Sequence, residues 1–237
     1  MLAKRNKSVK NTLRKVKNSH FRLEVSSDAS IFDEFYYKMH LPYIQNRHGE
    51  SSLEESYERM KARFSKNSDM LFLIKGSQRI AGIMICYQNG EALAYRLGVR
   101  NGDFRWVEKG AISALYVNTM SHCRAKGFKK LSLGGSRPFF SDGVLTYKQR
   151  NWNMKIDDYS KHFYFLIKPF KANPFAKEFL LNNSFISLNK GEMVVNTFYK
   201  NSRKENNRAK AMKTKDTKSG ISRVKRHTIG KMHPAPN

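Results

Sequence analysis

The stretch that decides the fold is GFKKLSLGGSRPFFSDGVLTYKQRNW, residues 127–152. It begins with Gly127 after a helix-like segment, and a glycine is the residue expected just beyond a helix end. Leu131 and Leu133 then alternate with polar neighbours, which indicates a short strand. The run therefore combines a helix end, a strand, a turn and a second strand in 26 residues.

Two turn signals follow the first strand of this run. The first is formed by Gly134, Gly135 and Ser136. The second is Asp142-Gly143, ahead of a strand expected over 144–148. Glycines after a buried strand expose backbone N–H groups, and nearby cations add positive charge, so we expect the turn to bind an anionic cofactor. The cations are Arg137, Lys148 and Arg150. An ordinary pair of tight turns flanked by solvated cations fits the same residues equally well.

The same run resembles the C-terminal part of a GNAT-type acyltransferase domain of the Fem-like branch, which includes the peptidoglycan Fem aminoacyltransferases. The matching features are a Gly-Gly-Ser after a strand, then Asp-Gly, then an aromatic-Lys pair and a further basic residue. Here the pair is Tyr147-Lys148 and the basic residue is Arg150. The resemblance implies an α+β GNAT (acyl-CoA N-acyltransferase) fold, with a mixed, mainly antiparallel sheet flanked by helices.

The resemblance also implies roles for single residues. Lys148 would donate to the tetrahedral oxyanion of an acyl transfer, and Asp142 would orient Lys148 or Arg150. Arg137 and Arg150 would hold phosphate or carboxylate groups, and Tyr147 would line the channel. The plain alternatives are a surface lysine on a strand, an aspartate that only makes the turn, and a tyrosine packed in the core.

Positive charge is concentrated at both ends of the chain. The 237 residues are 40% hydrophobic, enough for one core, and carry a net charge of +26. Residues 201–237 carry eleven Lys and Arg against two acids, and residues 1–22 carry eight against none. Such ends suit a polyanion, such as tRNA, an acidic polysaccharide or an anionic membrane face, although solvated tails have the same composition. The expected organisation is a basic N-terminal helix (1–20), an acyltransferase domain (21–200) and a basic, disordered tail (201–237).

The composition argues against several classes of protein. Cys86 and Cys123 lie in apolar runs, so buried, reduced thiols are expected rather than a disulfide scaffold. No Cys and His spacing typical of a metal site occurs. No apolar run reaches the roughly 18 residues of a membrane-spanning helix, and the basic N-terminus lacks the apolar segment of a signal peptide. A cytoplasmic protein without a membrane span is expected.

A short basic helix is expected over 12–17, with Leu13 and Val16 facing inward. In Fem-like acyltransferases a basic helix of this kind precedes the first strand, here 21–25, and lies near the place where an anionic substrate is held. A solvated basic helix is the alternative.

Two further helices are expected before the central sheet. Asp28 can cap the first, over 31–43, and the second runs over 53–64. Arg47 and His48 lie between them, a position that often faces a cleft. Resembling sequences carry a Pro-aromatic-x-x-x-Arg-His-Gly run here, which makes both residues candidates for binding substrate. A lone histidine is nevertheless more often structural.

A three-stranded antiparallel meander follows, over 70–75, 80–87 and 91–97. Asn89-Gly90 is the hairpin signal between the last two strands. A central helix over 110–126 and a strand over 130–133 come next. Beyond residue 152 the pattern predicts a strand over 159–169, a helix over 176–181, and a strand pair over 185–188 and 193–198.

The polar loop before the central helix, about 99–110, cradles the pyrophosphate of acetyl-CoA in the GNAT fold, because amides at a helix N-terminus bind anions. The usual Gln/Arg-x-x-Gly-x-Gly/Ala signature is not clear here, and only the run from Glu108 to Ala111 comes near it. Lys109 and Gly110 are the candidate cofactor-binding residues. Fem-like members use an aminoacyl-tRNA and lack this signature too, so the donor stays open between acetyl-CoA or another acyl-CoA and aminoacyl-tRNA.

The leading hypothesis is an enzyme that moves an acyl or aminoacyl group to an amine of a cell-envelope or polysaccharide precursor, such as an anionic small molecule or a sugar nucleotide. The alternative is a non-enzymatic protein that binds nucleic acid or another polyanion through its basic ends. A third hypothesis is a member of the fold that retains binding without catalysis.

Overall fold

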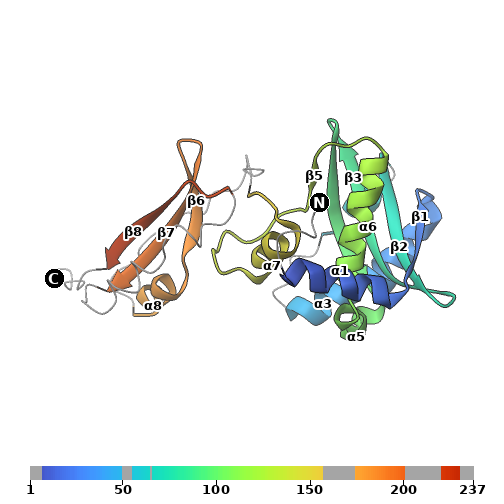
Figure 1. Cartoon of the computed structure of the whole chain (residues 1–237), viewed down its shortest axis with the longest axis horizontal. Coiled ribbons are helices and arrows are strands. Elements are labelled where there is room, and N and C mark those ends of the chain that lie inside the picture. The colour runs from blue at the N-terminus through green and yellow to red at the C-terminus, as the bar shows by residue number, and fades with distance from the viewer. Residues whose placement is uncertain (1–6, 50–54, 65, 157–173, 201–219, 230–237) are drawn as a thin grey trace. The chain divides into compact units, whose positions relative to one another are not determined.

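The computed structural model describes residues 7–49, 55–64, 66–156, 174–200 and 220–229 (Figure 1). The chain divides into two compact units, Met1–Gly134 and Gly135–Asn237, and each is described by itself. The acyltransferase domain expected over 21–200 therefore includes parts of both units.

The first unit is built on a five-stranded sheet in the order β1-β2-β3-β4-β5. Its strands are β1 (Arg22–Ser26), β2 (Ser68–Lys75), β3 (Gln78–Gln88), β4 (Glu91–Val99) and β5 (Leu131–Ser132). Neighbours from β1 to β4 are antiparallel, and β5 pairs with β4 in parallel. Asn89 and Gly90 have positive φ (51° and 74°) at the β3–β4 turn, as a tight hairpin requires. The predicted α+β class and the antiparallel meander are confirmed.

One face of this sheet is covered by a helical run and a separate helix. These are the short η2 (Ala29–Ile31), α2 (Phe32–Phe35), the π-helical η3 (Tyr36–His40), α3 (Leu41–His48) and α4 (Tyr57–Phe64). Asp28 caps the run, because its Oδ1 accepts a hydrogen bond from the Ser30 amide at 2.8 Å. Apolar side chains of α2, η3 and α4 form one buried cluster with Met70, Phe72 and Met84 of the sheet.

The helical run is longer than its sequence pattern indicated. It continues to His48 instead of ending near residue 43, and Pro42 lies at the beginning of α3. The π-helical turn comes directly before this proline, whose ring would clash with the carbonyl group four residues earlier in a regular α-helix. The widened turn therefore allows the helix to pass the proline, while α4 begins only at Tyr57.

Strand β4 touches this helical run at Gly98. A Cβ atom at Gly98 would lie 2.4 Å from the carbonyl carbon of Met39 and 2.5 Å from the amide nitrogen of His40. The two backbones therefore meet directly, which only glycine permits. His40 Nδ1 also lies 3.0 Å from the Leu97 carbonyl oxygen, so a hydrogen bond reinforces the contact.

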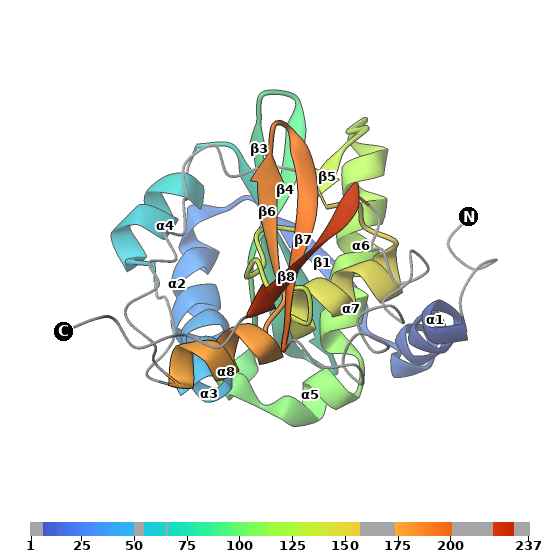
Figure 2. The ribbon, with the colours of Figure 1, turned by 90° about the vertical axis from the view of Figure 1, so that its left-hand side faces the viewer.

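The opposite face of the sheet carries α6 (Ala111–Ala125), and α1 (Lys7–Ser19) packs against α6 (Figure 2). The polar loop expected over about 99–110 is wrong in part, since this segment forms η5 (Arg100–Gly102) and α5 (Phe104–Glu108). Asp103 begins α5, because its Oδ1 accepts a hydrogen bond from the Arg105 amide at 2.9 Å. A capping aspartate was the signal for this helix.

The second unit contains two helices and a three-stranded sheet. They are α7 (Gly143–Trp152), α8 (Pro174–Asn182), β6 (Phe185–Asn189), β7 (Glu192–Lys200) and β8 (Arg223–Ile229). The predicted β6–β7 pair is confirmed. β8 pairs with β7 in parallel, a strand that the sequence pattern did not indicate within 201–237. The strand expected over 159–169 lies outside the described residues.

The strand expected over 144–148 is wrong, because these residues belong to α7. Asp142 is the reason: its Oδ1 accepts a hydrogen bond from the Leu145 amide at 2.8 Å and so caps a helix. Asp142-Gly143 is thus a helix start rather than a hairpin turn. Three candidate site residues move from a strand to a helix as a consequence, namely Tyr147, Lys148 and Arg150.

Candidate functional site

Lys148 places a buried amino group on α7. The residue is 3% exposed, and its Nζ donates hydrogen bonds to the Gly135 carbonyl oxygen at 2.9 Å and to Ser136 Oγ at 3.4 Å. Burial lowers the pKa of Lys148 to about 8, against a smaller opposing effect of the Asp142 charge. An amine in this range changes protonation state close to neutral pH, which makes Lys148 a candidate for chemistry rather than a surface lysine.

Asp142 organises the chain around this lysine. Besides capping α7, it accepts a hydrogen bond on Oδ2 from Arg137 Nε at 2.9 Å. The Asp142 side chain is 1% exposed, whereas that of Arg137 is 76% exposed. Asp142 therefore fixes the beginning of the helix that carries Lys148, and Arg137 extends from it into solvent.

The Gly-Gly-Ser turn presents oxygen atoms to Lys148. The Gly135 carbonyl and the Ser136 hydroxyl both face its amino group, in place of the N–H groups that the sequence predicted for an anion. Gly134 has a φ of +73°, and a Cβ on it would lie 3.3 Å from the Ala94 carbonyl oxygen of β4. Gly134, the last residue of the first unit, thus lies against β4.

Tyr147 and Arg150 lie on α7 with different surroundings. The Tyr147 ring packs edge-on against Trp152, with ring centroids 6.2 Å apart, which favours the packing role over that of a channel wall. Arg150 is exposed in the last turn of α7, where a cation complements the helix dipole. Within the second unit, the predicted residues that make direct contacts with each other are Gly135, Ser136, Arg137, Asp142 and Lys148.

Arg47 and His48 end helix α3 in the first unit. Arg47 Nη1 donates a hydrogen bond to the Tyr43 hydroxyl one helical turn earlier, and its guanidinium lies 5.7 Å from the centroid of the same ring. The residue remains exposed at the helix end. His48 is the last residue of α3. Their predicted role in substrate binding stays a prediction.

Lys109 and Gly110 lie at the N-terminus of the 15-residue α6. Gly110 is the N-cap with a φ of 92°, a left-handed conformation that favours glycine. A Cβ on Gly110 would lie 3.4 Å from the Cγ and Cδ atoms of Lys15 in α1. Lys109 Nζ lies 4.8 Å from the centroid of the Trp106 ring. Lys15 of α1 and Lys109 of the turn between α5 and α6 therefore lie near the positive end of the α6 dipole.

A buried carboxylate that sequence reasoning missed joins β2, β3 and α6. Asp69 Oδ2 accepts hydrogen bonds from Tyr87 OH at 2.6 Å and Lys126 Nζ at 2.8 Å, and lies 2.6 Å from His122 Nε2. Burial raises the pKa of Asp69, but the hydrogen bonds from Lys126, Tyr87 and His122 outweigh it and leave the pKa below its usual value. The four-residue spacing of His122 and Lys126, in the last turn of α6 and at its C-cap, was the available signal.

A second missed cluster surrounds Tyr95 on β4. Tyr95 OH donates a hydrogen bond to Glu55 Oε2, and Arg96 Nη2 lies 3.2 Å from the same oxygen. The guanidinium carbons of Arg63 and Arg96 lie 4.6 and 4.4 Å from the Tyr95 ring centroid. Burial, followed by the bond to Glu55, raises the pKa of Tyr95 to about 12. These residues come from three separate segments of the chain, so no local sequence motif predicts the cluster.

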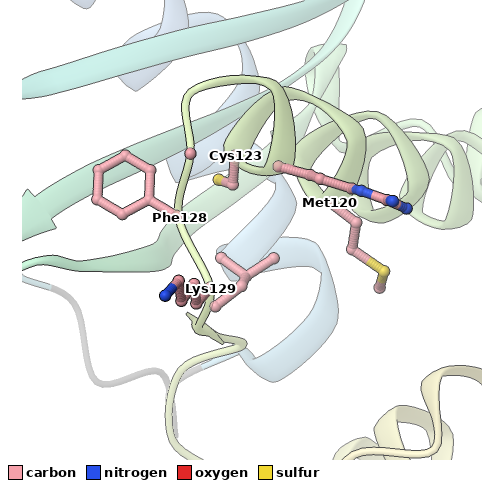
Figure 3. Close-up of a pocket in the computed structure, with 7 residues that line it drawn as sticks. Met120, Cys123, Phe128 and Lys129 are labelled. Atoms are coloured by element: carbon pink, nitrogen blue, oxygen red, sulfur yellow. The ribbon is translucent and has the colours of Figure 1, made fainter.

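A pocket of about 530 Å³ lies where α6 ends and the chain turns toward β5 (Figure 3). Its lining combines apolar side chains with two cations: Met120, Cys123, Phe128, Leu131, Arg124 and Lys129, with Gly127 at the turn. Burial raises the pKa of Cys123 to about 11, so its thiol is neutral and a poor nucleophile at neutral pH. The pocket is at the opposite end of α6 from Lys109 and Gly110.

Cys86 and Cys123 are both free and buried, as predicted. Across the described part of the chain, no group of His, Cys, Asp and Glu side chains is arranged to hold a metal ion. Nor does any helix among these residues have the length and apolar character needed to cross a bilayer.

No protein-family model and no curated protein sequence matches the chain. Among solved structures, it is similar to an aminoglycoside acetyltransferase from an uncultured soil metagenomic sample, in complexes with sisomicin and with trehalose. The TM-scores are 0.44 and 0.42, at 15% and 16% identity, with 64% and 62% of this chain and 99% and 97% of that chain covered.

The chain is also similar to the C-terminal domain of a protein of Agrobacterium fabrum that carries the name lysylphosphatidylglycerol synthetase. This match has a TM-score of 0.40 at 18% identity, and covers 54% of this chain and 40% of that one. Because these similarities are low, we base the proposed function on the contacts of the chain itself.

Proposed function

We propose that the protein is an acyltransferase that moves an acyl or aminoacyl group from a carrier to an amine. The observation that carries the proposal is the short β4–β5 pair, which spans only Ala92↔Leu131 and Leu93↔Ser132. Beyond Leu93, no described strand pairs with this edge of β4. The Tyr95 and Leu97 carbonyl oxygens already have partners in Arg96 and His40, so a ligand would bind through the other backbone groups of residues 94–99 on that side. An extended chain with amide groups, such as the arm of coenzyme A, suits a strand edge of this kind.

The N-terminus of α6 supports an anionic carrier. β4 ends at Val99, and α6 begins at Ala111 after the short α5. The helix dipole, with Lys15 and Lys109 beside it, favours a pyrophosphate or the phosphates of a tRNA end. The resemblance to Fem-like acyltransferases also implies that the basic N-terminal helix lies near an anionic substrate, and Lys15 on α1 fits that role. Acetyl-CoA, another acyl-CoA and aminoacyl-tRNA are the donors to be compared.

The chemistry asks little of the protein. The amine nitrogen bonds to the carbonyl carbon, the bond from that carbon to the carrier sulfur or oxygen breaks, and the amine gives up one proton. An N–H donor that stabilises the developing oxyanion speeds this step. We propose Lys148 as that donor, since its amino group is buried and fixed by Gly135 and Ser136. The acceptor we propose is the amine of an anionic cell-envelope or polysaccharide precursor.

A second candidate function is binding of nucleic acid or another polyanion without catalysis. It is favoured by β8, which carries Arg223, Lys225 and Arg226 on seven residues, all of them exposed. Phosphate contacts of this type make affinity fall steeply with salt. The same strand can serve an aminoacyl-tRNA donor, so the two functions differ in turnover rather than in binding.

The first experiment measures the melting temperature of the full chain with acetyl-CoA and with desulfo-CoA, which cannot carry an acyl group. A ligand that binds only the folded state at 100 times its Kd stabilises that state by about 2.7 kcal/mol. We expect both compounds to raise the melting temperature, and acetyl transfer to an amine acceptor to follow. Lys15→Gln and Lys109→Gln should each weaken binding about tenfold or more.

Lys10→Gln is the matched control, because Lys10 is an exposed residue of α1 and loses the same charge. Equal weakening in all three variants would indicate general charge attraction and contradict a site at α6. If no coenzyme A compound binds, transfer from aminoacyl-tRNA is measured next. Binding of tRNA without transfer of its aminoacyl group would overturn the enzyme proposal in favour of the second candidate.

A further inference from the structure

Strand β4 contains a bulge at Tyr95. In the β3–β4 register, Ile85 pairs with Ala94 and Met84 pairs with Arg96, so Tyr95 has no partner on β3. A bulge places two consecutive residues opposite one and redirects their side chains. Tyr95 and Arg96 consequently both reach Glu55, instead of alternating between the two faces of the sheet.

The bulge lies directly after the last β4–β5 pair, Leu93↔Ser132. Tyr95 is packed against the apolar cluster of α2, η3 and α4, so its side chain is on the face that these helices cover. The open edge of β4 begins at the same place in the strand. A ligand at Tyr95 would therefore lie beside the strand edge to which we assign the donor.

Glu55 cannot neutralise both cations around Tyr95. Its Oε2 lies 3.2 Å from Arg96 Nη2 and also accepts the hydrogen bond from Tyr95 OH. Arg96 Nη1 also donates a hydrogen bond to the Tyr95 carbonyl oxygen at 3.1 Å. A guanidinium has five N–H groups, so Arg96 is held by one hydrogen bond and one ion pair and keeps further N–H groups for a ligand.

Arg63 on α4 supplies the excess charge. Its guanidinium carbon lies 4.6 Å from the Tyr95 ring centroid, and the residue is exposed. Among the described residues, no carboxylate lies within ion-pair distance of Arg63. A guanidinium held over a ring by a cation–π contact keeps N–H groups that can donate hydrogen bonds to a ligand.

We propose that Arg63 and Arg96, both stacked on Tyr95, form a subsite for an oxyanion of the acceptor, either a carboxylate or a phosphate. Both guanidinium carbons lie within 4.6 Å of the centroid of the same ring, so both cations attract an oxyanion that binds beside Tyr95. Planar N–H pairs match the two oxygens of a carboxylate or phosphate. The proposal rests on the proposed function, which it deepens by assigning the anionic part of the acceptor to named residues.

The test measures binding of two probes, inorganic phosphate and acetate, to the full chain by calorimetry at constant ionic strength. We expect at least one probe to bind, and Arg63→Gln to weaken its binding about tenfold or more, as loss of a charged hydrogen bond predicts. The probe that loses affinity identifies the oxyanion as phosphate or carboxylate. Arg63 is exposed, so this variant should fold normally.

Arg105→Gln is the control, since Arg105 is also exposed and loses one positive charge, while its partner Asp103 belongs to its own helix cap. Unchanged binding in Arg63→Gln, or the same loss in Arg105→Gln, would overturn the subsite. In a transfer assay with an anionic acceptor, Arg63→Gln should raise the acceptor KM about tenfold with little change in kcat.

The two proposals fail in different ways. Loss of probe binding in Arg63→Gln, in a protein that transfers no acyl group, would support the oxyanion subsite and contradict the acyltransferase. Acyl transfer that is indifferent to Arg63→Gln, together with unchanged probe binding, would support the enzyme and overturn the subsite.

Discussion

Asp69 of the first unit and Lys148 of the second are both buried charged side chains, and their surroundings shift their pKa values for opposite reasons. In the first unit, three side chains meet the Asp69 carboxylate, and its pKa falls below the usual value because these partners outweigh burial. In the second unit, neutral oxygens of Gly135 and Ser136 meet the Lys148 amino group. Burial prevails there, and the pKa of Lys148 falls to about 8.

The contrast separates a charge that holds the fold from one that is poised to react. A carboxylate bound by several donors stays ionised and ties its elements together. An amine whose charged form is disfavoured by burial can lose or regain its proton near neutral pH. We therefore expect substitutions at Asp69 to act on stability, and substitutions at Lys148 to act on turnover.

The largest expected effect is that of Asp69→Ala on stability. Removing the carboxylate leaves Lys126, Tyr87 and His122 without their shared acceptor, so the free energy of unfolding should fall by about 3–5 kcal/mol. Urea denaturation measures it. Glu91→Ala is the control, because the Glu91–Lys130 pair is partly exposed and should contribute under about 1 kcal/mol. Equal losses in the two variants would contradict the assigned role of Asp69 in stabilising the fold.

Lys148→Met tests the second part of the comparison, the buried lysine of the second unit. Methionine has a similar length and no charge, so the free energy of unfolding at pH 7 should stay the same or rise by about 1–3 kcal/mol. Acyl transfer should fall about 100-fold, as for loss of one oxyanion donor. Lys155→Met replaces an exposed lysine of the same unit and should change neither quantity. Full activity of Lys148→Met would exclude the proposed role.

A pH titration tests the burial of Lys148 directly. Its folded pKa of about 8 lies below the ordinary 10.5, so between these values the unfolded chain binds the extra proton. The unfolding free energy of the wild type should therefore rise with pH over this window, relative to Lys148→Met, by up to about 1.4 kcal/mol per pH unit. Activity that needs the protonated amine should decline above about pH 8. A flat stability difference would show that Lys148 is solvated.

The smallest expected effect concerns the residues that position α7. Asp142→Ala removes the helix cap and should cost about 1–2 kcal/mol in unfolding free energy. Arg137→Ala removes only an exposed partner of the same carboxylate and should cost under about 1 kcal/mol. Thermal denaturation of both variants measures the difference. A larger loss for Arg137→Ala would mean that the ion pair, rather than the cap, fixes the helix.

Local pattern predicted much of the first unit. Apolar strands joined by Gly76 and by Asn89-Gly90 formed the expected meander, because turn chemistry and strand period agree there. Residues 144–148 show the limit of the method: a five-residue run fits a strand and a helix alike, and the Asp142 cap decided for the helix.

The polar clusters could not be predicted from local sequence. Tyr95 and Arg96 face Glu55 because of a one-residue bulge, and no local pattern marks such a bulge in an apolar strand. Asp69 meets its partners across 53 and 57 positions of sequence, at His122 and Lys126. Such contacts depend on tertiary packing, which a single sequence does not reveal.

The contact at Gly98 has a mechanical consequence. Because the backbone of β4 touches Met39 and His40 with no side chain between them, β4 and the helical run should move as one rigid body. Strand β5, by contrast, pairs with β4 at only two positions, Ala92↔Leu131 and Leu93↔Ser132. We therefore expect local opening at the β4 edge to occur by separation of β5 from β4. Amide hydrogens of β5 should then exchange faster than those of β3 and of the β4 residues paired with β3.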